Sequence, residues 1–213
     1  MANRCYLIKK PNSNQNAVYK EQDIVFGASY CIPFFWLSLF DKTDIKRMKL
    51  PGKQEENVMY YYDPEEWDEK ASPFPDNFPT LIVETSVAIR RFKERKEIIL
   101  AKIPSEQCGL YDQWLEVLQD IKEPFVQLDM HELWAMVVSY KKEDPGLFDN
   151  NLVKALEAFQ NGSEESWKTL FTYFVDSDYN AKLKKMSLPK TPASTQALPH
   201  LLCGYGWLNA YFW

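Results

Sequence analysis

Hydrophobic and polar positions form blocks along the chain, and the longest uncharged block lies near its beginning. Ile24 to Phe40 contains no charged residue and is rich in aromatic rings. Ile24 to Phe26 is typical of a strand, and Pro33 suits the first turn of a helix, where its missing N–H costs nothing. The pattern predicts a helix from Phe34 to Met48 that is apolar on all sides in its first half. Such a helix is normally buried, so this half is expected at the centre of the core.

Short runs rich in β-branched and aromatic residues predict a small sheet. Arg4 to Lys9 is such a run and is ended by Pro11 and a polar loop, after which Ala17 to Lys20 is a candidate return strand. Val58 to Tyr62 is another candidate strand, and Phe125 to Leu128 has the alternation of a half-buried one.

Helical spacing dominates the remaining blocks. Asp129 is placed to cap a helix that begins near His131. Ser163 is a reasonable start for a helix near the C-terminus. The other apolar repeats predict helices at Leu81 to Leu100, Leu110 to Ile121, Leu147 to Phe159 and Ser163 to Phe174.

These elements predict an α+β fold. We expect a small, mostly antiparallel sheet packed by five or six helices, with a helix-rich C-terminal half and one domain over residues 1–213. The alternative is an α+β domain over residues 1–143 followed by a helical subdomain over residues 144–213.

Composition narrows the class of protein. The chain has 25 Lys and Arg against 30 Asp and Glu, a net charge of −5, whereas nucleic-acid binders usually carry a basic excess. The four cysteines are far apart and form no Cys-x-x-Cys pair, so no metal site is predicted. No segment has the length of apolar sequence that a membrane span needs, and a cytoplasmic protein without a cofactor is expected.

Catalytic signatures are weak. The chain has two histidines, and His131-Glu132 lacks the second histidine of the zinc-hydrolase motif. A Cys–His pair, either Cys203 with His200 or Cys31 with His131, stays open because such pairs are spatial rather than sequential. A carboxylate centre also stays open, since 30 acids allow many pairs. No catalytic residue is assigned, and a small enzyme with either centre is the alternative function.

Two charged stretches are candidate binding surfaces. Arg90, Arg91, Lys93, Arg95 and Lys96 could meet phosphates, but Glu94 and Glu97 interrupt them, and we expect these charges on the solvent face of an amphipathic helix.

The stretch from Tyr60 to Pro79 combines acidic residues with aromatic rings and prolines. Carboxylates steer a basic partner, and Tyr and Trp supply the anchors that dominate interface energies. The predicted partner-binding residues are Tyr61, Tyr62, Asp63, Glu65, Glu66, Trp67, Asp68 and Glu69.

The chain begins Met-Ala-Asn-Arg-Cys-Tyr-Leu-Ile, has Ile32-Pro33 before an apolar helix, and continues from Phe125-Val126-Gln127-Leu128-Asp129 to Glu132. In these motifs it resembles a group of small bacterial cytosolic proteins that begin Met-Ala-Asn-Arg-Ser-Tyr-Leu-Tyr. Cys5 stands where that group has Ser. The group is similar to the immunity proteins encoded beside secreted toxins. The resemblance implies a non-enzymatic inhibitor whose partner is a basic toxin domain.

Overall fold

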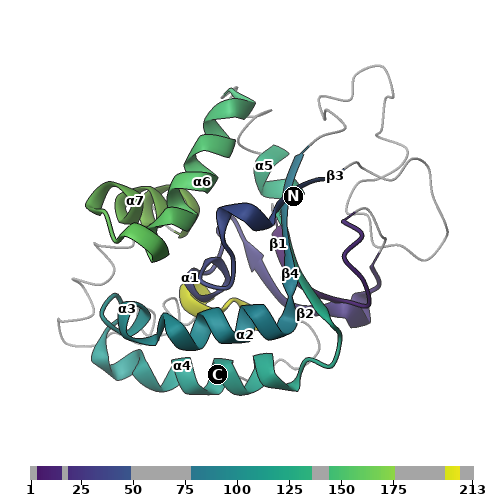
Figure 1. The fold of residues 1–213 in the computed structure, drawn as a ribbon, viewed down its shortest axis with the longest axis horizontal. Coiled ribbons are helices and arrows are strands. Elements are labelled where there is room, and N and C mark those ends of the chain that lie inside the picture. The colour runs from purple at the N-terminus through teal and green to yellow at the C-terminus, as the bar shows by residue number, and fades with distance from the viewer. Residues whose placement is uncertain (1–3, 16–18, 49–77, 136–143, 176–199, 207–213) are drawn as a thin grey trace.

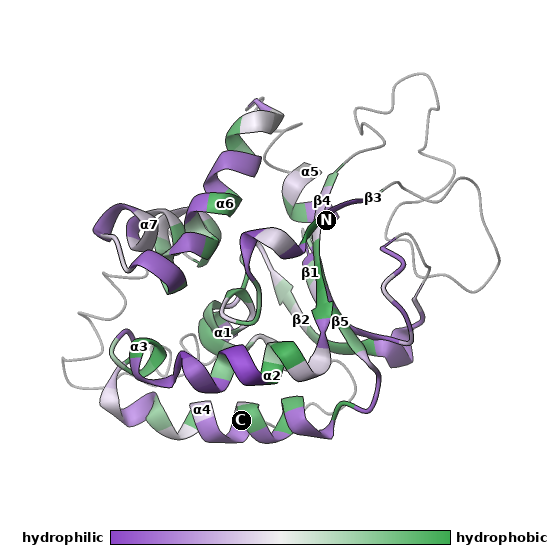
Figure 2. Cartoon of the chain, viewed as in Figure 1, coloured by the Kyte–Doolittle hydropathy of each residue, from purple (hydrophilic) through white to green (hydrophobic). Residues whose placement is uncertain are grey.

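The computed structural model describes residues 4–15, 19–48, 78–135, 144–175 and 200–206. In these residues the fold is α+β, and the helices gather mainly on one face of an antiparallel sheet (Figure 1). Figure 2 shows hydrophobic strands in the middle of the molecule and helices such as α2 and α4 that combine hydrophobic with hydrophilic positions. The predicted fold class is therefore confirmed.

The sheet has the strand order β3-β4-β5-β1-β2-β6, with antiparallel neighbours throughout. The strands predicted at Arg4 to Lys9 and Phe125 to Leu128 are confirmed as two adjacent central strands. The bounds are β1 (Arg4–Lys10), β2 (Ile24–Ser29), β3 (Ile45–Met48), β4 (Phe78–Glu84), β5 (Phe125–Asp129) and β6 (Tyr205–Gly206).

The N-terminal hairpin differs from the expected one. The second strand of this hairpin is β2, which pairs with β1 from Ile24 to Ser29. Tyr19 and Lys20 precede β2 outside any strand, and Ala17 lies outside the described residues. The predicted strand from Val58 to Tyr62 also lies outside them.

Seven α-helices fall in the described residues, and the helices predicted at Leu110 to Ile121 and Leu147 to Phe159 are confirmed as α4 and α6. Ser163 caps α7 by accepting a hydrogen bond from the Ser166 backbone N–H at 3.1 Å. The bounds are α1 (Phe34–Leu37), α2 (Thr85–Glu94), α3 (Lys96–Leu100), α4 (Cys108–Asp120), α5 (His131–Ala135), α6 (Pro145–Asn161) and α7 (Glu164–Thr169). Short 3₁₀ turns are η1 (Glu21–Asp23), η2 (Lys42–Asp44) and η3 (Ser105–Gln107), and a π-helical turn (Leu170–Val175) follows α7.

The prediction of a helix from Leu81 to Leu100 is wrong in its first part. Phe78 to Glu84 form β4, and the helix begins at Thr85. Leu81, Ile82 and Val83 are consecutive buried residues. A short apolar run inside a sheet cannot be distinguished from a buried helical segment by its periodicity alone.

The predicted helix from Phe34 to Met48 is likewise much shorter. After α1 the chain forms η2 and then β3, because side-chain groups take over the hydrogen bonds that a longer helix would make. The Ser38 hydroxyl donates to the Phe35 carbonyl at 2.6 Å, and an Asp44 carboxylate oxygen accepts from the Asp41 N–H at 2.7 Å. Such local bonds compete with helix continuation.

The predicted central position of this region is nevertheless correct. Every residue of α1 is fully buried. Trp36 donates from its indole N–H to the Cys203 carbonyl at 2.8 Å, which ties α1 to the C-terminal part of the chain. Gly204 follows with φ 75°, and a Cβ there would lie 2.5 Å from the Trp36 ring, so only glycine fits.

Within the described residues, no helix combines the length and the apolar character needed to cross a membrane.

Candidate functional site

The eight predicted partner-binding residues from Tyr61 to Glu69 lie outside the described residues. In the part of the chain that the structure describes, polar chemistry gathers in two places. The first, called the Asp129 cluster below, consists of Tyr19, Asp129, His131 and Glu132. The second, called the Arg95 network, consists of Asp41, Asp44, Arg91, Arg95 and Gln160.

The Asp129 cluster is built where β5 ends and α5 begins. Side chains alternate along a strand, so Val126 and Leu128 join the core beneath the helices while Gln127 and Asp129 point to the opposite face of the sheet. Asp129 is paired across the sheet with Tyr6 of β1 and is only 1% exposed. A carboxylate at this depth requires partners for both of its oxygens.

Both Asp129 oxygens have such partners. One oxygen accepts from the His131 backbone N–H at 3.1 Å and lies 2.8 Å from His131 Nδ1, which confirms Asp129 as the residue that caps the start of α5. The other accepts from the Tyr19 hydroxyl at 2.9 Å. The His131 ring also lies against Phe78, with 5.9 Å between ring centroids.

These contacts shift the pKa of each group. Burial alone would raise the pKa of Asp129, but the charge and hydrogen bonds of His131, with the bond from Tyr19, hold it below its usual value. Burial alone would lower the pKa of His131, but the carboxylate of Asp129 raises it. Burial and the Asp129 charge raise the pKa of Tyr19. Asp129 and His131 are therefore a buried ion pair when the imidazole is protonated.

Glu132 is the second carboxylate of the cluster and is only 5% exposed. Its Oε2 accepts from the Arg4 backbone N–H at 2.8 Å, whereas its buried Oε1 has no hydrogen-bond partner among the described residues. Burial raises its pKa and the Asp129 charge adds to this, against the opposing effects of the Arg4 N–H and His131.

A row of polar side chains continues from this cluster across the same face of the sheet. Lys10 donates from Nζ to Gln127 Oε1 at 2.7 Å and to the Asn14 carbonyl. Gln127 Nε2 donates to the Thr80 hydroxyl at 3.0 Å, and that hydroxyl donates to the Leu128 carbonyl at 2.8 Å. Burial lowers the pKa of Lys10 to about 8, although the nearby Asp129 charge opposes the shift.

The thiols of the chain offer less chemistry than these groups. Burial raises the pKa of Cys203, and burial, Cys31 and the nearby carboxylates raise the pKa of Cys5, so both thiols stay protonated. The raised pKa of Cys203 therefore gives no support to a pairing of Cys203 with His200. In the other candidate pair, Cys31 with His131, the imidazole directs its Nδ1 to Asp129. Among the described residues, no group of three or more His, Cys, Asp and Glu is placed to hold a metal ion.

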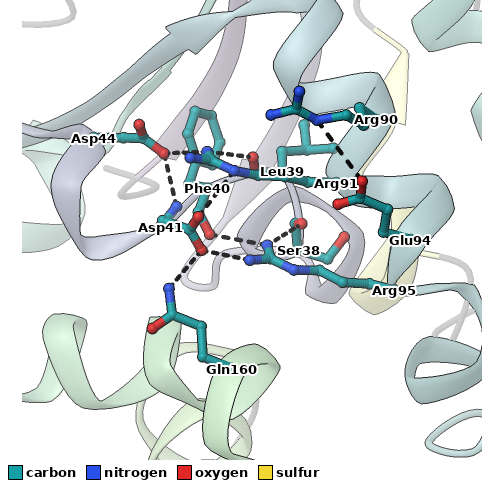
Figure 3. A network of polar contacts seen from close by, with 10 residues as sticks. All are labelled: Ser38, Leu39, Phe40, Asp41, Asp44, Arg90, Arg91, Glu94, Arg95 and Gln160. Carbon is teal, nitrogen blue, oxygen red and sulfur yellow. Dashed lines mark hydrogen bonds and ion pairs between the residues drawn. The ribbon is translucent and has the colours of Figure 1, made fainter.

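The Arg95 network lies on the helical side of the sheet, and Figure 3 shows how α2 reaches the chain after α1. Arg95 is only 8% exposed. It donates from Nη1 to the Ser38 carbonyl at 2.6 Å and the Phe40 carbonyl at 3.1 Å, and from Nη2 to Asp41. These carbonyls follow α1 directly, where no further helical turn supplies N–H donors to them. The Arg95 guanidinium donates to them instead.

Arg91 and Gln160 complete the network. Arg91 pairs through Nε with Asp41 at 2.9 Å and through Nη1 with Asp44 (Figure 3). Gln160 of α6 donates to Asp41 at 2.8 Å, so three separate segments meet at one carboxylate. Burial alone would raise the pKa of Asp41, but Gln160 and the two arginines hold it below its usual value.

The expectation that all of these basic side chains face solvent is therefore wrong for Arg91 and Arg95. Both point into the Arg95 network, where Arg95 is buried and Arg91 half-buried, whereas Arg90 is paired with Glu94 at 3.8 Å on the exposed side of α2. The spacing of four between Arg91 and Arg95 places them on one side of the helix. That spacing, beside the buried Phe92, was the signal in the sequence that could have revealed them.

Comparison with known proteins gives no relationship: no family model matches the chain, and neither a curated protein nor a solved structure matches it significantly. The fold and the two polar networks define an α+β protein with a buried cluster of titratable side chains. The resemblance to immunity-like proteins stays a prediction.

Proposed function

We propose that the chain is a protein-binding module of the immunity type, which neutralises a cognate bacterial toxin by covering its active site. The observation that carries this proposal is the distribution of charge. Residues 49–77 contain 8 of the 30 Asp and Glu but 3 of the 25 Lys and Arg, which leaves 22 of each sign in the rest of the chain. The entire net charge of −5 therefore belongs to this one stretch of sequence.

A concentrated charge of this kind suits a basic partner. Carboxylates accelerate the encounter with a positive surface, whereas the tightness of the complex depends on a few desolvated anchors. Tyr61, Tyr62 and Trp67 lie within the same stretch and are residue types favoured as anchors. A toxin that acts on nucleic acid carries a basic substrate site, which an acidic aromatic segment can occupy.

The acids of the described residues contrast with this stretch, because many already have a cation from the same chain. Asp149 pairs with Arg47 at 2.6 Å, and Glu157 pairs with Lys42 at 2.8 Å. Both ion pairs connect α6 to the segment that contains η2 and β3. Such acids are less free to attract a partner.

The partner is tested first by co-expression with the product of the adjacent gene. If that product arrests growth, the present chain should restore growth and co-purify with it in a defined ratio. Failure to protect and failure to bind would together remove the proposal.

Charge substitution then tests the segment itself. Replacing five acids by their amides should slow association about tenfold or more at low salt and flatten its dependence on salt. The variant carries amides at Asp63, Glu65, Glu66, Asp68 and Glu69. The matched control makes the same change in net charge at exposed acids elsewhere, namely Glu21, Glu97, Glu106, Glu116 and Asp120. Equal effects of the two variants would place the interface elsewhere.

The second candidate function is a small enzyme with a carboxylate centre, which the Asp129–His131 pair favours. A carboxylate that holds Nδ1 orients an imidazole as a general base, the arrangement used in acyl transfer. Turnover of a nitrophenyl ester or phosphate that is lost in His131→Asn, with the fold intact, would support this candidate. Absence of turnover across both substrate classes would count against it.

A further inference from the structure

The Asp129 cluster joins three separate parts of the chain. Glu132 of α5 accepts from the first described residue of β1, through the Arg4 N–H at 2.8 Å. Asp129 of β5 accepts from Tyr19, which precedes η1, at 2.9 Å. Helix α5 itself packs against β1 and β4, at the end of the sheet where Figure 1 places it. Groups that gain and lose protons therefore take part in the attachment of α5 to the sheet, beside the buried Leu133 and Trp134.

The charges in this cluster do not balance when every group has its usual ionisation at neutral pH. Asp129 and Glu132 contribute two buried carboxylates, and His131 contributes at most one positive charge. One Glu132 oxygen also lacks a hydrogen-bond partner among the described residues. A proton on the imidazole or on Glu132 removes part of this excess negative charge, so protonation favours the closed arrangement.

Among the described residues, the cations near the cluster are the Arg4 side chain, whose charge opposes the rise in the pKa of Glu132, and Lys10, which lies near Asp129. From β4 comes the Phe78 ring, which lies against His131 and carries no charge. The segment before η1 contributes the Tyr19 hydroxyl, and the chain after β2 contributes the Cys31 thiol, which lies near Cys5. The titratable or charged side chains that β1 contributes to this neighbourhood are Arg4, Cys5, Tyr6 and Lys10.

We propose that the Asp129 cluster is a proton-operated latch, which fastens α5 to the start of β1 when it holds an additional proton and loosens α5 when that proton leaves. The proton leaves from His131 or from Glu132, after which the excess negative charge of the two buried carboxylates, Asp129 and Glu132, is larger than before. Glu132 then moves toward water, and the bond from the Arg4 N–H is lost. The latch does not depend on the identity of any partner of the chain.

Amide hydrogen exchange measured by NMR on the full chain tests the latch. The Arg4 amide reports its closed state, because its hydrogen bond ends on Glu132. The Ile99 amide is the internal control, since it donates to the Arg95 carbonyl at 2.9 Å in a part of the chain held by arginines that do not titrate near neutral pH. Exchange rates are divided by the intrinsic rate at each pH to give protection factors.

We expect the protection of Arg4 to fall at least tenfold between about pH 5.5 and about pH 8.5, since each proton released on opening changes the opening constant up to tenfold per pH unit. The protection of Ile99 should stay constant. A constant value for Arg4 would overturn the latch, and a parallel fall in both amides would show global unfolding instead and would also overturn it.

Two variants assign the effect to the cluster. Glu132→Gln removes one titrating group, and His131→Asn removes the other while leaving an amide that can donate to Asp129. Each should flatten the pH dependence of Arg4 protection, and Glu97→Gln on exposed α3 should leave it unchanged. If His131→Asn does not fold, Glu132→Gln alone decides. An unchanged pH profile in the folded variants would overturn the assignment.

Discussion

The Arg95 network and the Asp129 cluster are both polar assemblies around buried charged groups, and both join distant segments, yet their charges are arranged differently. In the Arg95 network two guanidinium groups face two carboxylates. In the Asp129 cluster one imidazole contacts Asp129, and a second carboxylate, that of Glu132, lies near enough to feel both charges. Arginine does not lose its proton in proteins, so the first assembly keeps the same charge across the physiological pH range.

The difference shows that burial alone does not make a polar group responsive. In the Arg95 network, a balanced set of permanent charges connects α2 and α6 with the segment that follows α1. The pH has little influence on these contacts. The unbalanced set contains a histidine, whose ordinary pKa of about 6.5 lies close to neutral pH.

Arg95→Ala should have the largest effect, a loss of about 3 kcal/mol in the free energy of unfolding. Removing one member of a buried ion pair leaves its partners without compensation. Here the Ser38 and Phe40 carbonyls and one bond to Asp41 are affected together. Urea denaturation at two pH values checks the prediction, and the loss should be the same at about pH 6 and about pH 8.

Arg95→Lys separates charge from geometry in the same position. A lysine keeps the positive charge but cannot present the planar fork that reaches the Ser38 carbonyl and Asp41 together. We expect it to restore less than half of the lost free energy. Full restoration would mean that the network acts through charge alone.

Asp129→Asn should cost about 2 kcal/mol near pH 6, because it weakens charge-assisted bonds to His131 and Tyr19. The sign of its pH dependence follows from the raised pKa of His131. The stabilisation by the Asp129–His131 pair is fully present below the pKa of histidine in the unfolded chain, about 6.5. It is lost as pH rises through the pKa of His131 in the folded protein. The cost of the substitution should therefore shrink toward alkaline pH, as urea denaturation would show. Asp120→Asn, at the exposed end of α4, is the control.

The sequence was most informative where one local pattern determined the structure. Strand alternation located β5, and the short spacing from Asp129 to His131 identified the cap of α5. The uncharged block around Pro33 indicated the buried position of α1 correctly. These features depend on residues within a few positions of one another, which periodicity and capping rules describe well.

The sequence was least informative where distant residues decide the outcome. The length of α1 is limited partly by Arg91 and Arg95, more than fifty residues later, which bond the carbonyls at its end. The Asp129 cluster likewise needs Tyr19 and Arg4 beside β5, and only the strand pairing brings them there. The predicted binding residues from Tyr61 to Glu69 lie outside the described residues.

Glu132→Gln should stabilise the protein, whereas the loss of a buried charge ordinarily destabilises it. The pKa of Glu132 is higher in the folded protein than in the unfolded chain. The stability that protonated Glu132 contributes is therefore fully present below its unfolded pKa of about 4.3 and is lost as pH rises through its folded pKa. The amide carries no charge at any pH. Relative to the unsubstituted chain, the variant should gain about 1 kcal/mol between about pH 4.5 and about pH 8. Thermal unfolding across that range measures the gain, and a decline would contradict it.

Arg90→Ala should have the smallest effect, about 0.3 kcal/mol, and it defines the contrast with Arg95 on the same stretch of chain. The Arg90–Glu94 contact is 3.8 Å long, and both side chains are about two-thirds exposed at 64% and 65%. Solvent screens such a pair, and the two side chains lose entropy when they are held together. A double-mutant cycle with Glu94→Ala measures the interaction without other effects of truncation. A coupling near that of the buried arginines would mean that proximity to α2, rather than burial, determines the strength of these ion pairs.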